Sequence, residues 1–366
     1  MTTGPQPKPW IAAIHAYTPG RAKADDGRPL VKLSANENPL GCSPAVHEVL
    51  LEIHDSHFYP DPDACALREA IGELWNINPT RIVCGTGSGE LLHGAVQAFA
   101  GRGDEVLFPR YSFSLYPLLA RKVGAEPLFA DDNDHAPCVD GLLAAVTDRT
   151  RVVLLDNPNN PVGAWLPRRE VERLHAGLPR DVLLVVDQAY AEYLAQGQDD
   201  GALELAAAHD NVLVTRTFSK AYGIAGERVG WATGAPQLVD ALNRLRGAFN
   251  VTESGQKAAL AALDDQDFVA RAREHNLRLR QWFADEIAAL GHHGLRALPS
   301  EANFLLVLFE GALSAERALD VLAEAGYAVR HLPSQGLPNA LRITIGERRD
   351  MEQVAATLRD LAEGMR

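Results

Sequence analysis

Cysteines are scarce in this sequence, and it has no long apolar run. Its four cysteines, Cys42, Cys65, Cys84 and Cys138, form no CxxC pair and have no histidine ladder beside them, so we expect neither a disulfide framework nor a metal site. No run reaches the roughly 18 apolar residues that a membrane span requires. Residues 1–8 are polar and proline-rich and lack the apolar core of a secretion signal. We therefore expect a cytoplasmic protein without a membrane partner.

Positive charge is also in short supply. The chain has 35 Lys and Arg residues against 48 Asp and Glu residues, a formal net charge of −13. Nucleic-acid binding needs a basic surface that neutralises phosphates, so no nucleic-acid partner is expected. The 366 residues, 46% hydrophobic and 23% charged, are instead typical of a globular protein with about two domains of roughly 150 residues each.

Short Val- and Leu-rich runs alternate with helical stretches such as 89–100 and 167–178. Most of the runs lack polar alternation, which is typical of strands buried on both faces of a parallel sheet. The pattern predicts an α/β domain in which a mostly parallel sheet lies between helices. The predicted strands are 81–84, 105–108, 127–130, 152–155, 182–186 and 212–214.

The pattern changes after about residue 249. Helices are predicted at 256–263, 268–290, 315–325 and 351–363, with strands at 303–308, 328–330 and 341–345. This indicates a second, smaller α+β domain. We expect an N-terminal arm (1–35) that joins the small domain, a large domain (36–250) and a small C-terminal domain (251–366).

Three predicted strands end in polar residues. The strand 152–155 leads to Asn160, 182–186 leads to Asp187, and 212–214 leads to Lys220. In open α/β sheets, ligands bind beyond the carboxyl ends of the strands. We therefore expect these three side chains in one crevice.

Their chemistry indicates a pyridoxal-phosphate site. A desolvated Lys220 is a nucleophile able to form Schiff bases, Asp187 can pair with a pyridinium nitrogen, and the amide of Asn160 can donate to a phenolic oxygen. The turn GTGSGE (85–90) follows a predicted strand and opens a helix, so its backbone N–H groups suit a phosphate. Ser219 and Arg228 can add further phosphate contacts.

Seven motifs extend this interpretation to nearly the whole chain. They are KLSANENPLG (32–41), YPDP (59–62), GTGSGE (85–90), DNPNNPVG (156–163), VVDQAY (185–190), RTFSKAYGIAGERVG (216–230) and RITIG (342–346). With these motifs in this order, the sequence resembles the fold type I pyridoxal-phosphate-dependent aminotransferases and, within them, the histidinol-phosphate aminotransferases. That resemblance implies a seven-stranded, mostly parallel sheet in the large domain.

The resemblance assigns roles to the cofactor-binding positions. It implies that Lys220 holds the cofactor covalently and then moves the substrate proton, and that Asp187 pairs with the pyridine nitrogen. Asn160 and Tyr190 would contact the ring oxygen O3′, and Phe113 would stack on the ring. The phosphate would be held by Ser88, Gly89, Ser219 and Arg228.

Four further residues follow from the same resemblance. Tyr59 would reach the cofactor phosphate of a neighbouring subunit, which implies a homodimer with shared active sites. Arg342 would clamp the α-carboxylate of glutamate, a task for which a guanidinium has the bidentate geometry. Tyr17 and Arg330 would contact the phosphate of the substrate. Asn160 and Arg342 complete the expected substrate-binding residues.

The sequence departs from the family pattern at four positions. Gln188 stands where a glutamate is usual, Val162 replaces a hydroxyl residue, and Phe113 stands where a tyrosine is also found. Gly89 replaces a frequent acidic residue. Stacking needs a π face rather than a hydroxyl, and Asp187 is retained, so we expect the chemistry to survive these changes.

Several interpretations stay open on the sequence. The leading one is an aminotransferase for L-histidinol phosphate and 2-oxoglutarate. An aromatic amino-acid aminotransferase is an alternative, because pocket shape separates similar groups weakly, and a threonine-phosphate decarboxylase has similar motifs. A non-enzymatic regulator would want an added DNA-binding region. Individually, Lys220 is compatible with a surface lysine, Asn160 with turn chemistry and Arg342 with a structural ion pair.

Overall fold

The computed structural model describes residues 4–14, 23, 27–52 and 57–364. Within these residues, seven strands form the main sheet, six of them parallel and β10 antiparallel to both of its neighbours. The α/β fold class predicted from the sequence is confirmed. In spatial order the strands are β2 (Ile82–Gly85), β10 (Gly230–Gly234), β9 (Val212–Thr217), β8 (Leu183–Asp187), β7 (Thr150–Asp156), β3 (Glu105–Pro109) and β4 (Glu126–Ala130).

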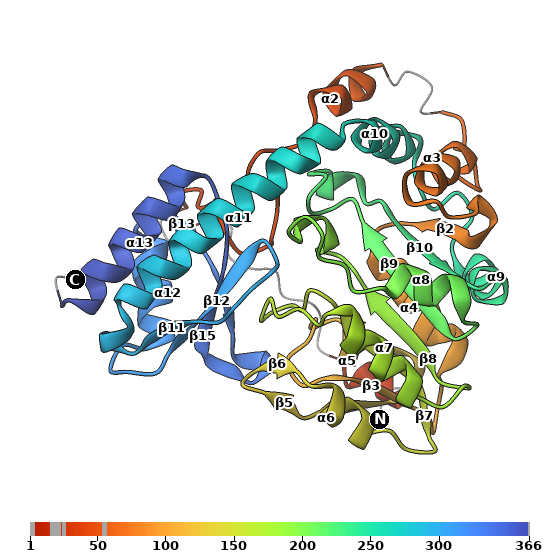
Figure 1. Ribbon diagram of the computed structural model, residues 1–366, viewed down its shortest axis with the longest axis horizontal. Coiled ribbons are helices and arrows are strands. Elements are labelled where there is room, and N and C mark those ends of the chain that lie inside the picture. Colours follow the sequence, from red (N-terminus) through yellow and green to blue (C-terminus); the bar gives the residue numbers. More distant parts are fainter. Residues whose placement is uncertain (1–3, 15–22, 24–26, 53–56, 365–366) are drawn as a thin grey trace.

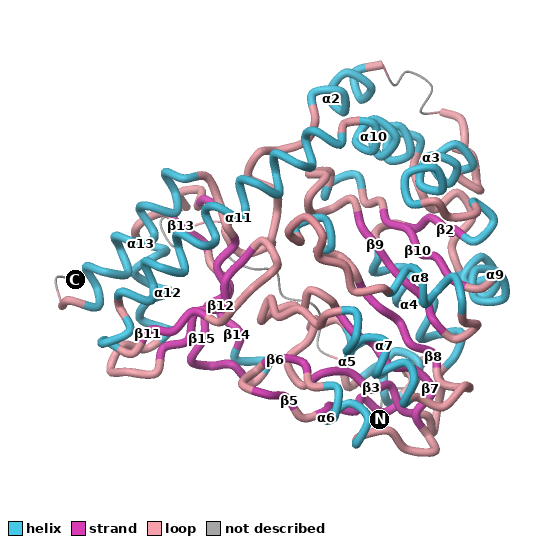
Figure 2. The backbone as a smooth tube through the Cα atoms, viewed as in Figure 1, coloured by secondary structure: helices cyan, strands magenta, loops and turns pink. Residues whose placement is uncertain are grey.

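Helices cover both faces of this sheet (Figures 1 and 2). One face packs on α4 (Ser88–Phe99), α5 (Tyr116–Val123) and α9 (Pro236–Leu245). The opposite face packs on α6 (Val139–Ala144), α7 (Arg168–Gly177) and α8 (Ala202–Ala208). Towards β2 and β10 it packs on α2 (Pro44–Leu51), α3 (Cys65–Trp75) and α10 (Glu253–Asp264). Because neighbouring residues of a strand face opposite sides, the strands with helices on both faces contain runs of consecutive apolar residues, such as 152–155 in β7 and 183–186 in β8.

A second, four-stranded antiparallel sheet follows α10 along the chain. One face packs on the long helix α11 (Gln266–Ala289) with α12 (Ala315–Glu324) and α13 (Arg348–Ala362). Figure 1 shows α11 running from the neighbourhood of α10 to this sheet, so one helix spans both halves of the molecule. In spatial order the strands are β11 (Leu295–Ala297), β12 (Phe304–Phe309), β15 (Leu337–Thr344) and β14 (Arg330–Leu332).

The N-terminal segment contacts both halves. The strand β1 (Val31–Lys32) pairs in parallel with β13 (Tyr327–Ala328), beside the four-stranded sheet. The short helix α1 (Pro9–Ala12) lies against α5, where the ring of Trp10 covers Gly124. The remaining short elements are β5 (Asp132–Asn133), β6 (Ala136–Pro137), η1 (Pro79–Arg81), η2 (Ala191–Tyr193), η3 (Ala225–Glu227), η4 (Gly291–His293) and η5 (Pro333–Gln335).

Local chemistry explains where the helices near the second sheet begin. Thr252 accepts a hydrogen bond from the Gly255 amide and so caps α10, and Asp265 does the same for α11 through the Phe268 amide. A side-chain oxygen at this position satisfies an amide that has no acceptor within the helix. Because Thr252 caps α10 and Asp265 caps α11, the second helix can begin directly after the first one ends.

The structure corrects some details of the predicted elements. Strand β10 was not predicted, because its sequence GWATG is short and has a glycine at each end. Strand β11 was missed as well, and the strand predicted at 328–330 divides between β13 and β14. Among the described residues, no helix is both long and apolar enough to cross a membrane.

Gly223 closes the turn that follows Lys220. Its φ is +73°, and a Cβ added there would lie 1.7 Å from the carbonyl oxygen of Gly41. This close backbone contact joins the predicted cofactor-binding loop to the segment 32–41, and only glycine allows it.

Gly223→Ala should therefore lower the free energy of unfolding by about 2 kcal/mol or more. The measurement is urea unfolding of the purified protein, with Gly226→Ala as the matched control. An added Cβ at Gly226 meets no described atom within 4 Å, so we expect a change within about 0.5 kcal/mol. Equal stability of the two variants would show that the contact with Gly41 does not constrain the loop.

Candidate active site

The carboxyl ends of β7, β8 and β9 meet at one edge of the main sheet. The strand register pairs Asp156 with Asp187, and Asp187 with Thr215. Asn160 follows the end of β7, and Lys220 follows the end of β9. The structure thus brings Asn160, Asp187 and Lys220 to one edge.

Asp187 is buried and surrounded by donors. Its Oδ1 accepts a hydrogen bond from the Thr215 hydroxyl at 3.0 Å, and its Oδ2 accepts one from the Tyr116 hydroxyl at 3.3 Å. Burial raises the pKa of Asp187 to about 6, although these hydrogen bonds and the nearby Lys220 oppose the rise. A carboxylate held in this way attracts a cationic N–H group strongly.

Asp156 is a second buried carboxylate, to which the sequence analysis assigned no role. Its Oδ2 accepts the backbone N–H groups of Asn160 at 2.7 Å and Phe113 at 3.2 Å, and its Oδ1 accepts the Asn159 amide at 3.0 Å. Burial raises its pKa to about 7, and the neighbouring Asp187 adds to the rise. Asp156 therefore holds two predicted cofactor contacts, Asn160 and Phe113, in fixed relative positions.

The Tyr190 hydroxyl receives two hydrogen bonds. The amide of Asn36 donates to it at 2.9 Å and the amide of Asn160 at 3.2 Å. The orientation of Asn160 is determined by Arg342, which donates to Asn160 Oδ1 at 2.5 Å and can only donate. Because both lone pairs of the Tyr190 oxygen are occupied, its proton points to a third group. Tyr190 is thus arranged as a donor to a ligand oxygen.

Lys220 lies beside this cluster. Its Nζ donates to the carbonyl oxygen of Ala35 at 3.0 Å and lies 5.8 Å from the centre of the Tyr190 ring. Burial, followed by the nearby Arg342, lowers the pKa of Lys220 to about 8. An appreciable fraction of the amine is therefore neutral near physiological pH, which a nucleophile or a base requires.

Arg342 and Arg330 occupy neighbouring strands of the small sheet. Arg342 is 9% exposed, donates to the Ser34 carbonyl at 2.8 Å and lies over the Phe304 ring at 5.3 Å. The register places Arg330 directly opposite Arg342, and opposite residues of an antiparallel pair face the same side of a sheet. Two guanidinium groups on one side favour an anionic ligand group there.

The turn before α4 forms a cradle with Arg228. Gly87 precedes the helix with φ +82°, and a Cβ at this position would lie 2.5 Å from the Arg228 guanidinium. Arg228 donates to the Ser219 hydroxyl at 3.1 Å. The amides of Ser88 and Gly89 open the helix, where backbone N–H groups have no acceptor within the helix.

These groups fit pyridoxal phosphate. The cradle offers a guanidinium, a hydroxyl and helix N-terminal amides, which match a phosphate dianion. The buried carboxylate of Asp187 matches a pyridinium N–H, and the directed Tyr190 proton matches a phenolic oxygen. Gly87 has a φ of +82°, which favours glycine, and a Cβ there would displace the Arg228 guanidinium from the turn; this close approach of Arg228 to the turn is the observation that carries the fit.

Of the other predicted aromatic residues, Tyr59 lies apart from this cluster and Phe113 lies beside it. Tyr59 is 80% exposed, and its ring stacks on Phe249 with centroids 4.4 Å apart. Phe113 is half-buried, with its ring edge against Tyr116 at 5.9 Å. Tyr17 lies outside the described residues.

Gln188 has a specific structural environment. Its Nε2 donates to Asp200 at 2.6 Å, and its Oε1 accepts from Arg216 at 2.8 Å. A glutamate at this position would place a second negative charge against the buried Asp200, so the amide explains the departure at 188. Val162, another of the departures, is buried in an apolar cluster with Leu306.

Some site residues were missed by the sequence analysis. Asp156 stood in the motif DNPNNPVG, and its place directly after a buried strand was a usable signal. Asn36 stood in the motif KLSANENPLG, but no role was assigned to it. Tyr116 and Thr215 carry no local signal, because only the folded structure brings them to Asp187.

Comparison with known proteins identifies the family. The model of the family "Aminotransferase class I and II" matches residues 28–358. The chain therefore belongs to the class I and II aminotransferases.

Individual relatives within this family are similar to the chain over nearly its whole length. The chain is 64% identical to a histidinol-phosphate aminotransferase of Erythrobacter litoralis, over 99% of this chain and 98% of that protein. It is 58% identical to the histidinol-phosphate aminotransferase of Zymomonas mobilis, over 99% of each. The crystal structure of histidinol-phosphate aminotransferase from Sinorhizobium meliloti in complex with pyridoxal-5'-phosphate matches with a TM-score of 0.90 and 28% identity, covering 100% of both chains.

Asp187→Asn should make the stability of the cofactor-free protein less dependent on pH. The pKa of about 6 in the folded state exceeds the usual 3.8, so the folded protein binds this proton more tightly than the unfolded chain does. The stability linked to Asp187 is therefore complete below about pH 4 and is lost as the pH rises through about 6.

The measurement is the free energy of urea unfolding without cofactor at pH 5 and pH 7.5. Wild type should lose more stability than Asp187→Asn, which keeps the loss linked to Asp156. The exposed Asp148→Asn variant is the control and should follow wild type. An identical loss in all three proteins would mean that Asp187 does not carry the buried charge.

Proposed function

We propose that this protein is a pyridoxal-phosphate-dependent aminotransferase that interconverts L-histidinol phosphate and 2-oxoglutarate with imidazole acetol phosphate and L-glutamate, in histidine biosynthesis. One observation carries the class of reaction. Lys220, Asp187 and the directed hydroxyl of Tyr190 lie at one edge of the sheet, beside a phosphate cradle and a buried arginine. The substrate is supported by near full-length identity of 64% to a histidinol-phosphate aminotransferase.

We propose the following residues for holding the cofactor. Asp187 would hold the pyridine nitrogen, and Asn160 and Tyr190 would hold O3′. Phe113 would cover the ring, and Asp156 would keep the amides of Phe113 and Asn160 in place. The phosphate would be held by Ser88, Gly89, Ser219 and Arg228, with Tyr59 supplied by a second subunit.

Bound pyridoxal phosphate supplies an electron sink that makes the Cα–H bond of an attached amino substrate acidic. Lys220 would then be the group that removes the proton from Cα, because its lowered pKa leaves an appreciable fraction of the amine neutral. General base catalysis of this kind typically contributes about 10²- to 10⁴-fold. Asp187 would keep a proton on the pyridine nitrogen, since a cationic N–H group beside the buried carboxylate stabilises its charged form.

Substrate binding is assigned to the arginines of the small sheet. Arg342 would clamp the α-carboxylate of glutamate, and Arg330 with Tyr17 would bind the phosphate of histidinol phosphate. The shared side of Arg330 and Arg342 supports this, because one anionic locus must accept a carboxylate in one half-reaction and a phosphate in the other. Phenylalanine has a carboxylate but no phosphate. A comparison of phenylalanine with histidinol phosphate as substrates therefore distinguishes an aromatic amino-acid aminotransferase from the proposed enzyme.

We further propose a cytoplasmic homodimer with shared sites. The exposed Tyr59, which lies outside the cluster of its own chain, supports a role in a second copy. The division into an arm (1–35), a large domain (36–250) and a small domain (251–366) also remains a proposal. The separate cores of the two sheets support it, while the packing of α10 against α2 and α3 favours a boundary nearer α11.

Lys220→Ala should abolish covalent fixation of the cofactor. Wild-type protein with pyridoxal phosphate is expected to be yellow, and borohydride reduction should leave the cofactor attached, as detected by mass spectrometry of peptides. The exposed Lys257→Ala variant is the control and should behave as wild type. Fixation of the cofactor in Lys220→Ala, or a colourless wild type, would contradict the proposed role.

The substrate can be tested with three compounds. We expect kcat/KM to be highest for L-histidinol phosphate and lower for L-phenylalanine. With O-phospho-L-threonine we expect no release of carbon dioxide. Arg330→Ala should lower kcat/KM for histidinol phosphate about tenfold more than for phenylalanine, because a charge-assisted contact is worth at least about 1.4 kcal/mol. If histidinol phosphate were the poorest substrate, the substrate assignment would be wrong.

A further inference from the structure

The segment between α9 and α10 holds an unusual backbone conformation. Phe249 has φ +55° although it is not a glycine. A bulky side chain rarely adopts this left-handed conformation, which persists only where the surrounding structure imposes it. Such a residue marks a place where the position of its side chain matters.

The conformation presents the Phe249 ring to Tyr59. The two rings are stacked, with centroids 4.4 Å apart and an angle of 19° between their planes. Tyr59 is nevertheless 80% exposed and Phe249 37% exposed. The contact therefore orients Tyr59 without burying it, and an exposed, oriented phenol is suited to a group outside its own chain.

The next residue, Asn250, reaches the phosphate cradle. Its Nδ2 donates to Glu90 at 2.8 Å, and the same Glu90 oxygen accepts the backbone amide of Thr86 at 2.7 Å. Glu90 and Thr86 belong to the turn that opens α4, beside Ser88 and Gly89. Neighbouring residues thus hold the Tyr59 ring and the cradle of the same chain.

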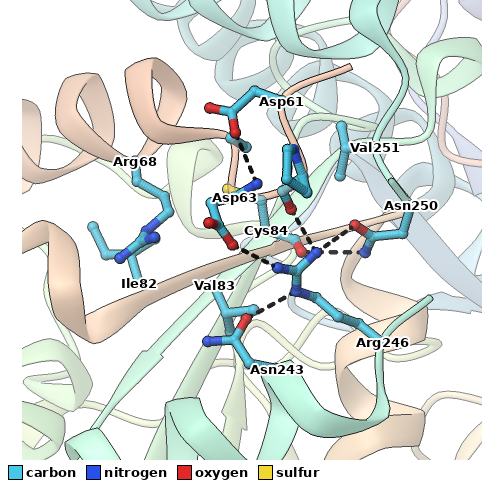
Figure 3. A pocket seen from close by; sticks show the side chains of 12 residues that line it. Asp61, Asp63, Arg68, Ile82, Val83, Cys84, Asn243, Arg246, Asn250 and Val251 are labelled. Carbon is cyan, nitrogen blue, oxygen red and sulfur yellow. Dashed lines mark hydrogen bonds and ion pairs between the residues drawn. The ribbon is translucent and has the colours of Figure 1, made fainter. Parts of the chain in front are cut away.

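Arg246 forms hydrogen bonds with the residues that follow Tyr59 in the chain. Figure 3 shows Arg246 among its partners. Its guanidinium donates to the Pro62 carbonyl at 2.6 Å, to Asp63 at 3.0 Å and to Asn250 Oδ1 at 3.2 Å. The space among these groups is about 10 Å³, about the smallest volume that admits a single water molecule. It is a packed junction rather than a ligand site.

We propose that Arg246 and Phe249 position Tyr59 for the cofactor phosphate of a second copy of this chain, with Phe249 as the positioning residue that contacts the Tyr59 ring. The proposal rests on the homodimer with shared sites proposed above. Phe249 acts through Tyr59 and touches neither substrate nor cofactor. Asn250 acts separately, through Glu90 and Thr86, on the cradle of its own chain.

The test is a double-mutant cycle with Tyr59→Phe and Phe249→Asn, read as the dissociation constant of pyridoxal phosphate from the dimeric protein. Asparagine tolerates positive φ, so Phe249→Asn removes the ring without adding backbone strain. Tyr59→Phe keeps the ring stack and loses the hydroxyl. Phe249→Tyr keeps the stack and is the conservative control.

We expect Tyr59→Phe to weaken cofactor binding about tenfold, the usual loss for a hydrogen bond to a charged group. Phe249→Asn should weaken it by about three- to tenfold, and Phe249→Tyr by less than about twofold. The double variant should match Tyr59→Phe alone within about twofold, because both changes act through one hydroxyl. Asn250→Ala should weaken binding further in the Tyr59→Phe background.

Urea unfolding checks that the variants remain folded, and sedimentation velocity checks that they remain dimeric. If Tyr59→Phe weakens binding and Phe249→Asn does not, the role of Phe249 is overturned while the shared site stands. Fully additive losses would likewise overturn it, because Phe249 would then act independently of Tyr59. If neither change affects binding, the shared site itself fails.

Discussion

Two carboxylates, Asp156 and Asp187, lie side by side at the ends of adjacent parallel strands, with water excluded from both. In a low-dielectric interior such a pair is costly to ionise, and both pKa values are raised accordingly. The parallel register of β7 and β8 makes the proximity unavoidable once both strands end in aspartate. Much of the surrounding structure supplies donors to these two groups.

The two carboxylates differ in their hydrogen-bond partners and therefore in their roles. Asp156 is satisfied by protein groups, chiefly the backbone amides of Asn160 and Phe113, and so acts as a fixed anchor. Asp187 accepts hydrogen bonds from the hydroxyl groups of Thr215 and Tyr116, and a ligand cation beside it would stabilise its charged form. Stability and function oppose each other at Asp187, which is common at sites that bind a cofactor.

The sequence predicted the sheet and the polar residues at its edge better than it predicted the supporting contacts. Buried strands in a parallel sheet are apolar throughout, so 152–155, 182–186 and 212–214 were recognised together with the polar residues that follow them. Strand β10 escaped because a short antiparallel strand bounded by glycines has no such pattern. The contacts of Asn36 with Tyr190 and of Arg246 with Asp63 join residues more than 150 positions apart. Such pairings depend on the folded geometry rather than on spacing.

The segment before Glu37 has a mechanical consequence. Three successive residues contact the site: the Ser34 carbonyl accepts from Arg342, the Ala35 carbonyl accepts from Lys220, and Asn36 donates to Tyr190. The same segment continues from β1, which is paired with β13 next to the small sheet. A rotation of the small sheet against the main sheet would therefore pull on one short tether and alter all three hydrogen bonds together. The hydrogen bonds of Lys220, Arg342 and Tyr190 to this tether would therefore change together when the relative orientation of the two sheets changes.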